Sequence, residues 1–260
     1  MRIVVAFFIL LCSISLLEAQ TGAAVGDWVS LKATTMVGPQ TIEVKQRHAI
    51  VGEEKDAEGK LLWWFETQID MGGQQILTKL LVPASAFGET EVSSAQFNKS
   101  ARRWITKMGD QPAVELPVEE AMKQFQGMMG LAEDPNAKVT ELGEEEIETP
   151  KGKMKCTKKG YQGKASMEQA QGPIVMTITN TYDRTIWRTA AVPIVGMAKV
   201  EEKGLVEVST QVPMPGTPPP QPQETHSLTV VEDFGQGAKS AITEEPAAVP
   251  APAPVPAPGK

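Results

Sequence analysis

The feature that most constrains the fold of this chain is a repeated pattern of extended segments separated by turns, clearest in residues 173–212. β-branched residues are concentrated in residues 174–181, which is typical of a strand. Turn-forming residue types follow in residues 180–184 and again around Gly204. We therefore expect short antiparallel strands, joined by tight turns, that follow one another in a meander.

The same pattern runs through most of the chain and predicts a mainly β protein with a single antiparallel meander sheet. The strand around Trp63, Trp64 and Phe65 is apolar on both of its faces, so we expect it to be covered on both sides. The full set of expected strands is residues 27–36, 41–51, 60–70, 74–82, 102–108, 113–116, 139–147, 153–159, 174–181, 185–189, 198–201, 205–212 and 226–233.

Residues 117–130 form the one predicted helix, because their apolar residues fall at helical spacing on a single face. These residues are Val118, Met122, Phe125 and Met129. Methionine adapts to irregular or variable apolar partners. Two interpretations follow: a helix packed permanently on the sheet, or a lid over a pocket for a flexible apolar ligand.

The N-terminus has the features of a secretory signal peptide, which we place at residues 1–19. Arg2 supplies the positive charge, residues 3–17 are apolar, and Ala19 is a small residue at the cleavage position. The apolar run is shorter than the roughly 20 residues that a membrane span needs, although an uncleaved anchor is the alternative. Lipidation at Cys12 is disfavoured, since the preceding residue is not small. A periplasmic or secreted protein is expected.

The last 17 residues of the mature chain differ in composition from the rest. Residues 20–243 carry the strand pattern and form the expected β-rich domain. Residues 244–260 alternate proline and alanine and are expected to be a disordered tail, which could reach a partner in the cell envelope.

Charge and cysteine content exclude several classes of protein. The formal net charge of −7 argues against nonspecific binding of nucleic acid or of anionic membranes. Only Cys156 remains after signal cleavage, so no intramolecular disulfide can form. A buried strand cysteine is expected, with a thiol activated by Lys155 and Lys158 as the alternative.

Hydrolytic and metal-binding patterns are absent from the sequence. There is no G-x-S-x-G motif, and the two histidines, His48 and His226, lack the spacing of zinc ligands. His48 falls on the apolar face of a strand, and His226 follows a proline-rich loop, where we expect it to be solvated. We predict no catalytic residues, no metal and no cofactor, and therefore not an enzyme.

Two further motifs have simple structural interpretations. Three consecutive glutamates, residues 144–146, would point to alternating faces of a strand and are expected to be a solvated charge run rather than a calcium site. Residues 235–240 resemble the end of a phosphate-binding loop, but Ala238 stands where glycine is required. We expect a flexible exit from the last strand.

Three pieces of the sequence together resemble the periplasmic lipoprotein-carrier family. They are residues 26–29 (GDWV), residues 63–66 (WWFE) and the segment from Thr185 through Val192-Pro193-Ile194 to Val200. The resemblance implies an open, strongly curved half-barrel whose concave apolar face, covered by a helical lid, shelters acyl chains. The proline-rich segment 212–222 and the proline/alanine tail depart from that family's pattern.

These observations lead to one functional hypothesis and one alternative. The first is an exported, non-enzymatic protein that binds a lipid or another long apolar ligand in the concavity of the half-barrel. The residues expected to contact it are Trp63, Phe65, Met122, Phe125 and Met129. The alternative is an exported structural or interaction module with a filled core and a tail that reaches a partner.

Overall fold

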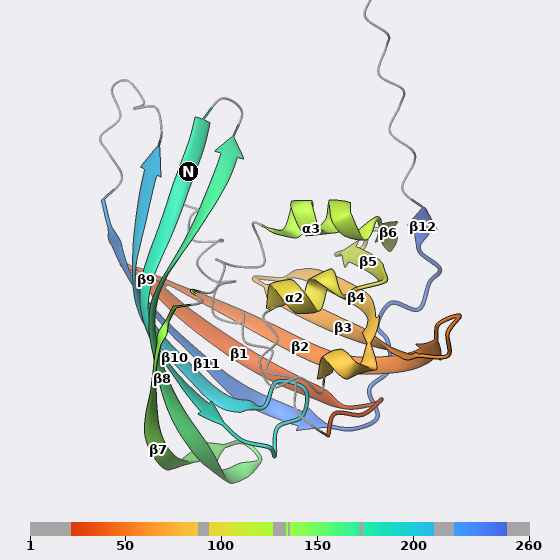
Figure 1. Ribbon diagram of the computed structural model, residues 1–260, viewed down its shortest axis with the longest axis horizontal. Coiled ribbons are helices and arrows are strands. Elements are labelled where there is room, and N and C mark those ends of the chain that lie inside the picture. The colour runs from red at the N-terminus through yellow and green to blue at the C-terminus, as the bar shows by residue number, and fades with distance from the viewer. Residues whose placement is uncertain are drawn as a thin grey trace, which may run out of the picture.

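The protein is built around one large, strongly curved β-sheet (Figure 1). The computed structural model describes residues 22–87, 94–126, 134, 136–171, 174–210 and 221–248. The strands are β1 (Trp28–Val37), β2 (Gln40–Lys55), β3 (Leu61–Met71), β4 (Gln74–Pro83), β5 (Arg103–Met108), β6 (Val114–Leu116), β7 (Lys138–Thr149), β8 (Gly152–Gln171), β9 (Ile174–Arg188), β10 (Met197–Thr210), β11 (Gln223–Gly235) and β12 (Ala247–Ala248).

The strand order is β12-β6-β5-β4-β3-β2-β1-β11-β10-β9-β8-β7. Pairing is antiparallel throughout, except that β12 adds to β6 in parallel. Among the described strands, β7 and β12 lie at the two ends of this order, so the sheet is open and not closed into a barrel. The expected fold class, a mainly β protein with one open antiparallel sheet, is confirmed.

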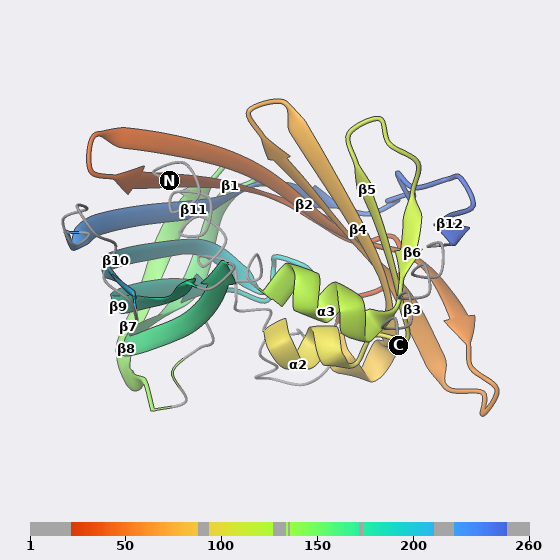
Figure 2. The same ribbon diagram turned by 90° about the horizontal axis from the view of Figure 1, so that it is seen from above.

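Three short helical segments lie inside the curve of the sheet (Figure 2). They are η2 (Ala84–Phe87), α2 (Ser94–Lys99) and α3 (Val118–Gln126), and α2 and α3 pack against β4, β5 and each other. We call the face of the sheet that carries these helices the concave face. The described part of the predicted helix is present, beginning at Val118, and its first turn is closed by the N–H of Ala121 donating to the carbonyl of Pro117. Sequence analysis missed α2, which is too short to show helical periodicity.

The expected turns at residues 180–184 and around Gly204 are wrong, because β9 and β10 run through them without interruption. Asn180 and Arg184 are buried on one face of β9. A Cβ at position 204 would stand 2.6 Å from Asn180 Oδ1, so glycine is required here by a close approach of side chains and not by a turn. The same residue types favour both situations, and only tertiary contacts separate them.

The prediction that the disordered tail begins at Glu244 is also wrong, because residues 244–248 are ordered against the sheet. Glu244 pairs with Lys107 at 2.6 Å, and Ala247–Ala248 continues into the sheet as β12. Segment 236–248 is held to β3 by Glu66, whose carboxylate accepts hydrogen bonds from Ser240 Oγ and from the backbone N–H of Ala241. Residues 249–260 and the predicted signal peptide lie outside the described residues.

Ile242 explains why this segment stays in place. It is buried against Leu77, Ile105 and Ala113 on the outer side of the sheet, opposite the helices, and Trp64 packs on the same cluster. Residues 235–240 are therefore anchored and do not form the flexible exit that the sequence indicated. As expected, β3 is covered on both sides, by α2 and η2 on one and by segment 236–248 on the other.

No helix within the described ranges is long and apolar enough to cross a membrane.

Candidate functional site

The part of the concave face beneath α2 is filled by aromatic side chains. Phe65 from β3 contacts Phe87 and Phe97 in edge-on geometry, with ring centroids 5.7 and 5.3 Å away, and those two rings lie 5.2 Å apart. All three are buried. Trp63 packs on Phe87 at 5.2 Å. Edge-to-face rings at these distances exclude water efficiently, so this region is a dry core.

The structure brings together three of the five predicted ligand contacts. Trp63 and Met122 are half-buried and pack against the hydrophobic cluster that contains Phe65. Met129 and the side chain of Phe125 lie outside the described residues. Sequence analysis missed Phe87 and Phe97, because neither lies in a segment with a strong periodic pattern.

His48 borders this aromatic region and is buried, as its place on an apolar strand face indicated. Its ring stacks on Phe65 at 5.8 Å, and Nδ1 shares a hydrogen bond with Thr67 Oγ1 at 3.1 Å. Nε2 has no hydrogen-bond partner among the described residues. Burial lowers the pKa of His48 to about 4, so the ring is neutral near pH 7.

A line of polar side chains crosses the concave face on the other half of the sheet. Thr35, Ser227, Glu202 and Arg184 lie directly opposite one another on β1, β11, β10 and β9. Strand register places them on the concave face. Thr67 lies on the same face of β3 as Phe65, which contacts the helices, and it is opposite His48 on β2, which is itself opposite Val29 on β1. Thr35 lies on the same face as Val29, because the two are separated by an even number of residues. We call these residues, together with Asn180, Thr225 and Thr229, the polar band.

Hydrogen bonds join the members of the polar band. Arg184 Nε donates to Glu202 Oε2 at 2.6 Å, and Asn180 Nδ2 donates to Glu202 Oε1 at 3.2 Å. Thr35 and Ser227 share a hydrogen bond of 2.8 Å between their hydroxyls. All five side chains are buried. An ion pair in such a place is tolerated only because each charge is matched by its partner.

Apolar side chains lie on both sides of the polar band. Val200 and Ile186 flank it toward the main core, while Val37 and Val206 flank it on the other side in a smaller cluster. The concave face of β1 and β9–β11 is therefore apolar, then polar, then apolar along the strands. Sequence analysis missed this band, since Asn180, Arg184 and Glu202 were interpreted as turn residues and the other members alternate with polar residues in their strands.

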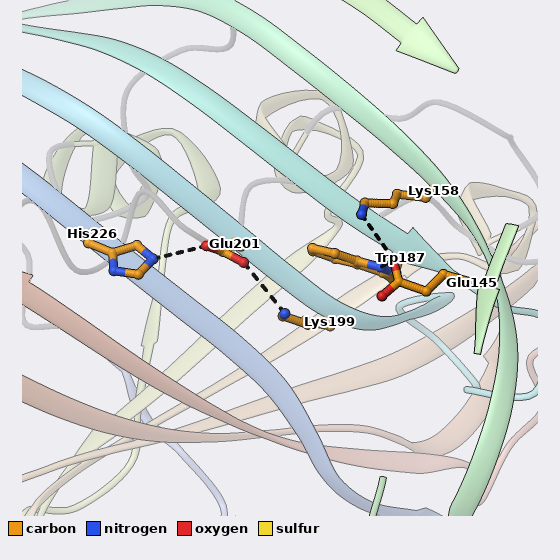
Figure 3. Close-up of polar contacts among 6 residues, drawn as sticks. All are labelled: Glu145, Lys158, Trp187, Lys199, Glu201 and His226. Carbon is orange, nitrogen blue, oxygen red and sulfur yellow. Dashed lines mark hydrogen bonds and ion pairs between the residues drawn. The ribbon is translucent and has the colours of Figure 1, made fainter. Parts of the chain in front are cut away.

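The opposite face of the same strands carries a row of charged residues (Figure 3). His226 Nε2 lies 3.2 Å from Glu201 Oε1, and Lys199 Nζ lies 3.5 Å from Glu201 Oε2. The ammonium group of Lys199 also sits 4.3 Å from the ring centroid of Trp187. The row thus connects β11 to β9. His226, which was expected to be solvated, is half-exposed and also contacts Glu201.

Trp187 extends this row toward β7. Its Nε1 donates to Glu145 Oε2 at 2.9 Å, and Lys158 contacts the same carboxylate oxygen and lies over the Trp187 ring (Figure 3). The hydrogen bond from Trp187 and then that from Lys158 lower the pKa of Glu145. The neighbouring glutamates, Glu144 and Glu146, pair with lysines on β8, so residues 144–146 form cross-strand ion pairs.

An open groove of about 830 Å³ lies at the end of β8–β11. Most of its lining side chains, among them Met36, Leu205 and His226, alternate with the buried ones and so belong to the outer side of the sheet. Its lining combines two acidic side chains, Asp183 and Glu224, with the basic Lys203 and with His226. This mixture of charges points to no single class of ligand.

Cys156 is buried, as expected, and burial raises the pKa of its thiol. Within the described part of the chain, no cluster of three potential ligands is placed to hold a metal ion. The candidate functional site is therefore the concave face, with its filled aromatic region and its polar band.

Comparison with known proteins gives similarity in structure only. No protein-family model matches the sequence, and no curated protein matches it. A protein from Bacteroides fragilis, described as exported and as having a YmcC-like fold, is 12% identical, with 84% of this chain and 100% of that chain covered and a TM-score of 0.37.

Two other similar structures have still lower scores. A DUF1329 family protein from Desulfovibrio piger is 8% identical, with 93% of this chain and 95% of that one covered, at a TM-score of 0.28. A LolA superfamily protein from Nitrosomonas europaea is 8% identical, with 85% and 90% covered, at a TM-score of 0.20. The function proposed below therefore rests on the geometry of this chain alone.

Proposed function

We propose that this chain is an exported, non-enzymatic protein that binds a lipid or another long apolar molecule in the concavity of its half-barrel. The observation that carries the proposal is the form of the concave face. It is open, strongly curved and apolar on both sides of the polar band, and its described helices pack against β4 and β5 only at one side (Figure 2). Such a surface suits a ligand with long apolar parts.

The most direct test is to look for a bound lipid. Native mass spectrometry of the gently purified protein should show an additional mass that is lost on organic extraction. A neutral fluorescent probe such as Nile red should then bind to the delipidated protein with saturation. Absence of both signals would contradict the proposal.

Met122→Glu tests the position of the ligand. Met122 is half-buried on α3, so in a liganded concavity the helix can lift and let the carboxylate reach water. We expect the circular dichroism spectrum to be retained and binding of the probe to weaken at least about tenfold. The matched control is Met36→Glu, on the outer side of the sheet, which should leave binding unchanged.

The filled aromatic region favours a second candidate, an interaction module without a ligand. Phe65, Phe87 and Phe97 pack against one another beneath α2, and each is at most 4% exposed. In that case Met122→Glu would unfold the protein or cost several kcal/mol, on the order of the cost of an unpaired buried charge, and the wild type would bind no probe.

Export is proposed from Arg2 and the apolar residues 3–17. N-terminal sequencing of the mature protein should begin close to Gln20, and an intact Met1 would contradict cleavage. Contact of residues 249–260 with a partner in the envelope stays a prediction.

A further inference from the structure

We propose that the concave site prefers an uncharged amphiphile with hydroxyl groups, such as a monoacylglycerol, over a fatty acid with the same acyl chain. This inference rests on the proposed function and specifies the polar part of its ligand. It is argued from the hydrogen-bonding capacity that the polar band leaves unused, from its charge, and from the apolar surfaces beside it.

Two oxygens of the polar band are buried without a hydrogen-bond partner among the described residues: Asn180 Oδ1 and Thr229 Oγ1. The side chains of Asn180 and Thr229 are only 4% and 2% exposed. Buried polar atoms in native proteins are almost always paired, so two unpaired ones on one face require an explanation. A ligand that supplies the missing partners is such an explanation.

The orientation of the Asn180 amide follows from its neighbour. An ionised carboxylate can only accept hydrogen bonds, so the amide nitrogen must face Glu202 Oε1, as the 3.2 Å contact has it. The oxygen Oδ1 is then left over, and an amide oxygen can only accept. The partner that the band lacks at this position is therefore a donor.

Gly204 makes room for this oxygen on the concave face. A Cβ at position 204 would stand 2.6 Å from Asn180 Oδ1 and 2.8 Å from Thr225 Oγ1. The backbone of Gly204 is extended and needs no glycine for conformational reasons. The missing side chain instead makes room for the side chains of Asn180 and Thr225, which pack over Gly204 on the concave face.

The charge of the polar band disfavours an anionic ligand. Glu202 and Arg184 form a neutral pair in which both side chains are only 6% exposed. A second carboxylate brought beside this pair would place two negative charges next to one positive charge in a region of low dielectric constant, where repulsion is poorly screened. A hydroxyl group adds donors without this cost.

The flanking apolar clusters decide that the ligand has long apolar parts. Val200 and Ile186 lie on one side of the band, and Val37 and Val206 on the other. Asn180 lies opposite Val206 and Thr229 opposite Val200, six residues apart on β10, so a single head group can reach only one of them. An acyl chain placed along the strands would contact one or both clusters while its polar end reaches Asn180 Oδ1. A monoacylglycerol combines a single chain with two hydroxyl donors.

The experiment compares two ligands with one acyl chain. Nile red bound to the delipidated mature protein is displaced at neutral pH by monooleoylglycerol or by oleate, each below its micelle concentration. We expect monooleoylglycerol to act at a concentration at least about tenfold lower, the scale of one or two well-placed hydrogen bonds.

Two variants act on the unpaired amide oxygen: Asn180→Leu removes it with little change of shape, and Gly204→Ala sets a Cβ 2.6 Å from its position. Either should reduce the preference to within about threefold while Nile red still binds, and having both keeps the test valid if one fails to fold. Thr181→Val, next to Asn180 but pointing to the other face of β9, should keep the wild-type preference.

Equal displacement by the two ligands in the wild type would overturn the inference and leave the proposed function intact. Preference retained in both variants would also overturn it, because the polar band would then not be its source. If neither ligand nor Nile red binds, the proposed function and the inference fail together.

Discussion

The two halves of the concave face are built from the same kind of strand but are stabilised differently. Over β3–β5, aromatic side chains such as Phe65 and Phe97 fill the space beneath the helices. Over β1 and β9–β11, a buried polar band that contains Glu202 and Arg184 runs between two apolar clusters. The first half depends on packing density and the second on matched charges and hydrogen bonds, so substitutions should affect them through different mechanisms.

This difference also bears on where the proposed ligand would bind. A close-packed aromatic core cannot admit a molecule without losing its own contacts. A surface with an unpaired acceptor such as Asn180 Oδ1 would gain a hydrogen bond from a ligand that carries a donor. The aromatic region beneath α2 is thus the structural support, and the specificity of the proposed site is expected to come from the polar half.

The largest effect is expected in the filled half. Phe65→Ala removes a ring that contacts Phe87 and Phe97 and should lower the free energy of unfolding by about 4 kcal/mol, the cost of a large cavity. Urea denaturation measures it. Leu205→Ala on the exposed outer side of β10 is the control and should change stability by less than about 0.5 kcal/mol. A similar loss in both variants would mean that the aromatic region is not close-packed.

A smaller loss is expected from breaking the ion pair of the polar half. Glu202→Gln leaves Arg184 buried beside a neutral group and should lower the free energy of unfolding by about 3 kcal/mol. Replacing both residues with apolar ones, Glu202→Leu with Arg184→Met, should recover most of this loss, because no unmatched charge remains. If the double variant is as unstable as the single one, the pair is not governed by charge matching.

His48 makes the filled half sensitive to acid. Its folded-state pKa of about 4 lies below its ordinary value of 6.5, so the unfolded chain takes up a proton first as the pH falls. The free energy of unfolding should therefore decrease between about pH 6.5 and pH 4 and level off below, by up to roughly 3 kcal/mol, since each pKa unit corresponds to about 1.4 kcal/mol.

The contribution of His48 is measured as the difference between the wild type and His48→Leu in urea denaturation at several pH values. His226→Gln, at the half-exposed histidine on the outer side, should not reproduce this difference. A pH dependence that is unchanged in His48→Leu would assign the acid sensitivity to carboxylates.

The smallest of these effects concerns the C-terminal segment. Ending the chain after Lys239 removes Ile242 and the donors to Glu66, and should cost about 2 kcal/mol from the lost apolar burial. Ending it after Ala248 should leave the melting temperature unchanged within error. A clear decrease in the longer variant would show that residues 249–260 pack on the domain.

Sequence alone determined the local character of this protein. Alternation of apolar and polar residues predicted the antiparallel strands, and the spacing of Val118 and Met122 predicted the helix α3. These features depend only on near neighbours in the chain. The apolar residues on both faces of β3 likewise indicated that both of its sides would be covered.

Tertiary structure decided everything that depends on which side chains meet across strands. Glycine and asparagine are residue types typical of turns. Only the placement of Gly204 and Asn180 on neighbouring long strands shows that Gly204 makes room for the side chain of Asn180. Glu244 carries no sequence signal for its contact with Lys107, since the two residues are far apart in the chain. The polar band is invisible in sequence for the same reason: Thr35, Ser227, Glu202 and Arg184 become one line only through the register of four strands, which is set by side-chain packing across the whole sheet.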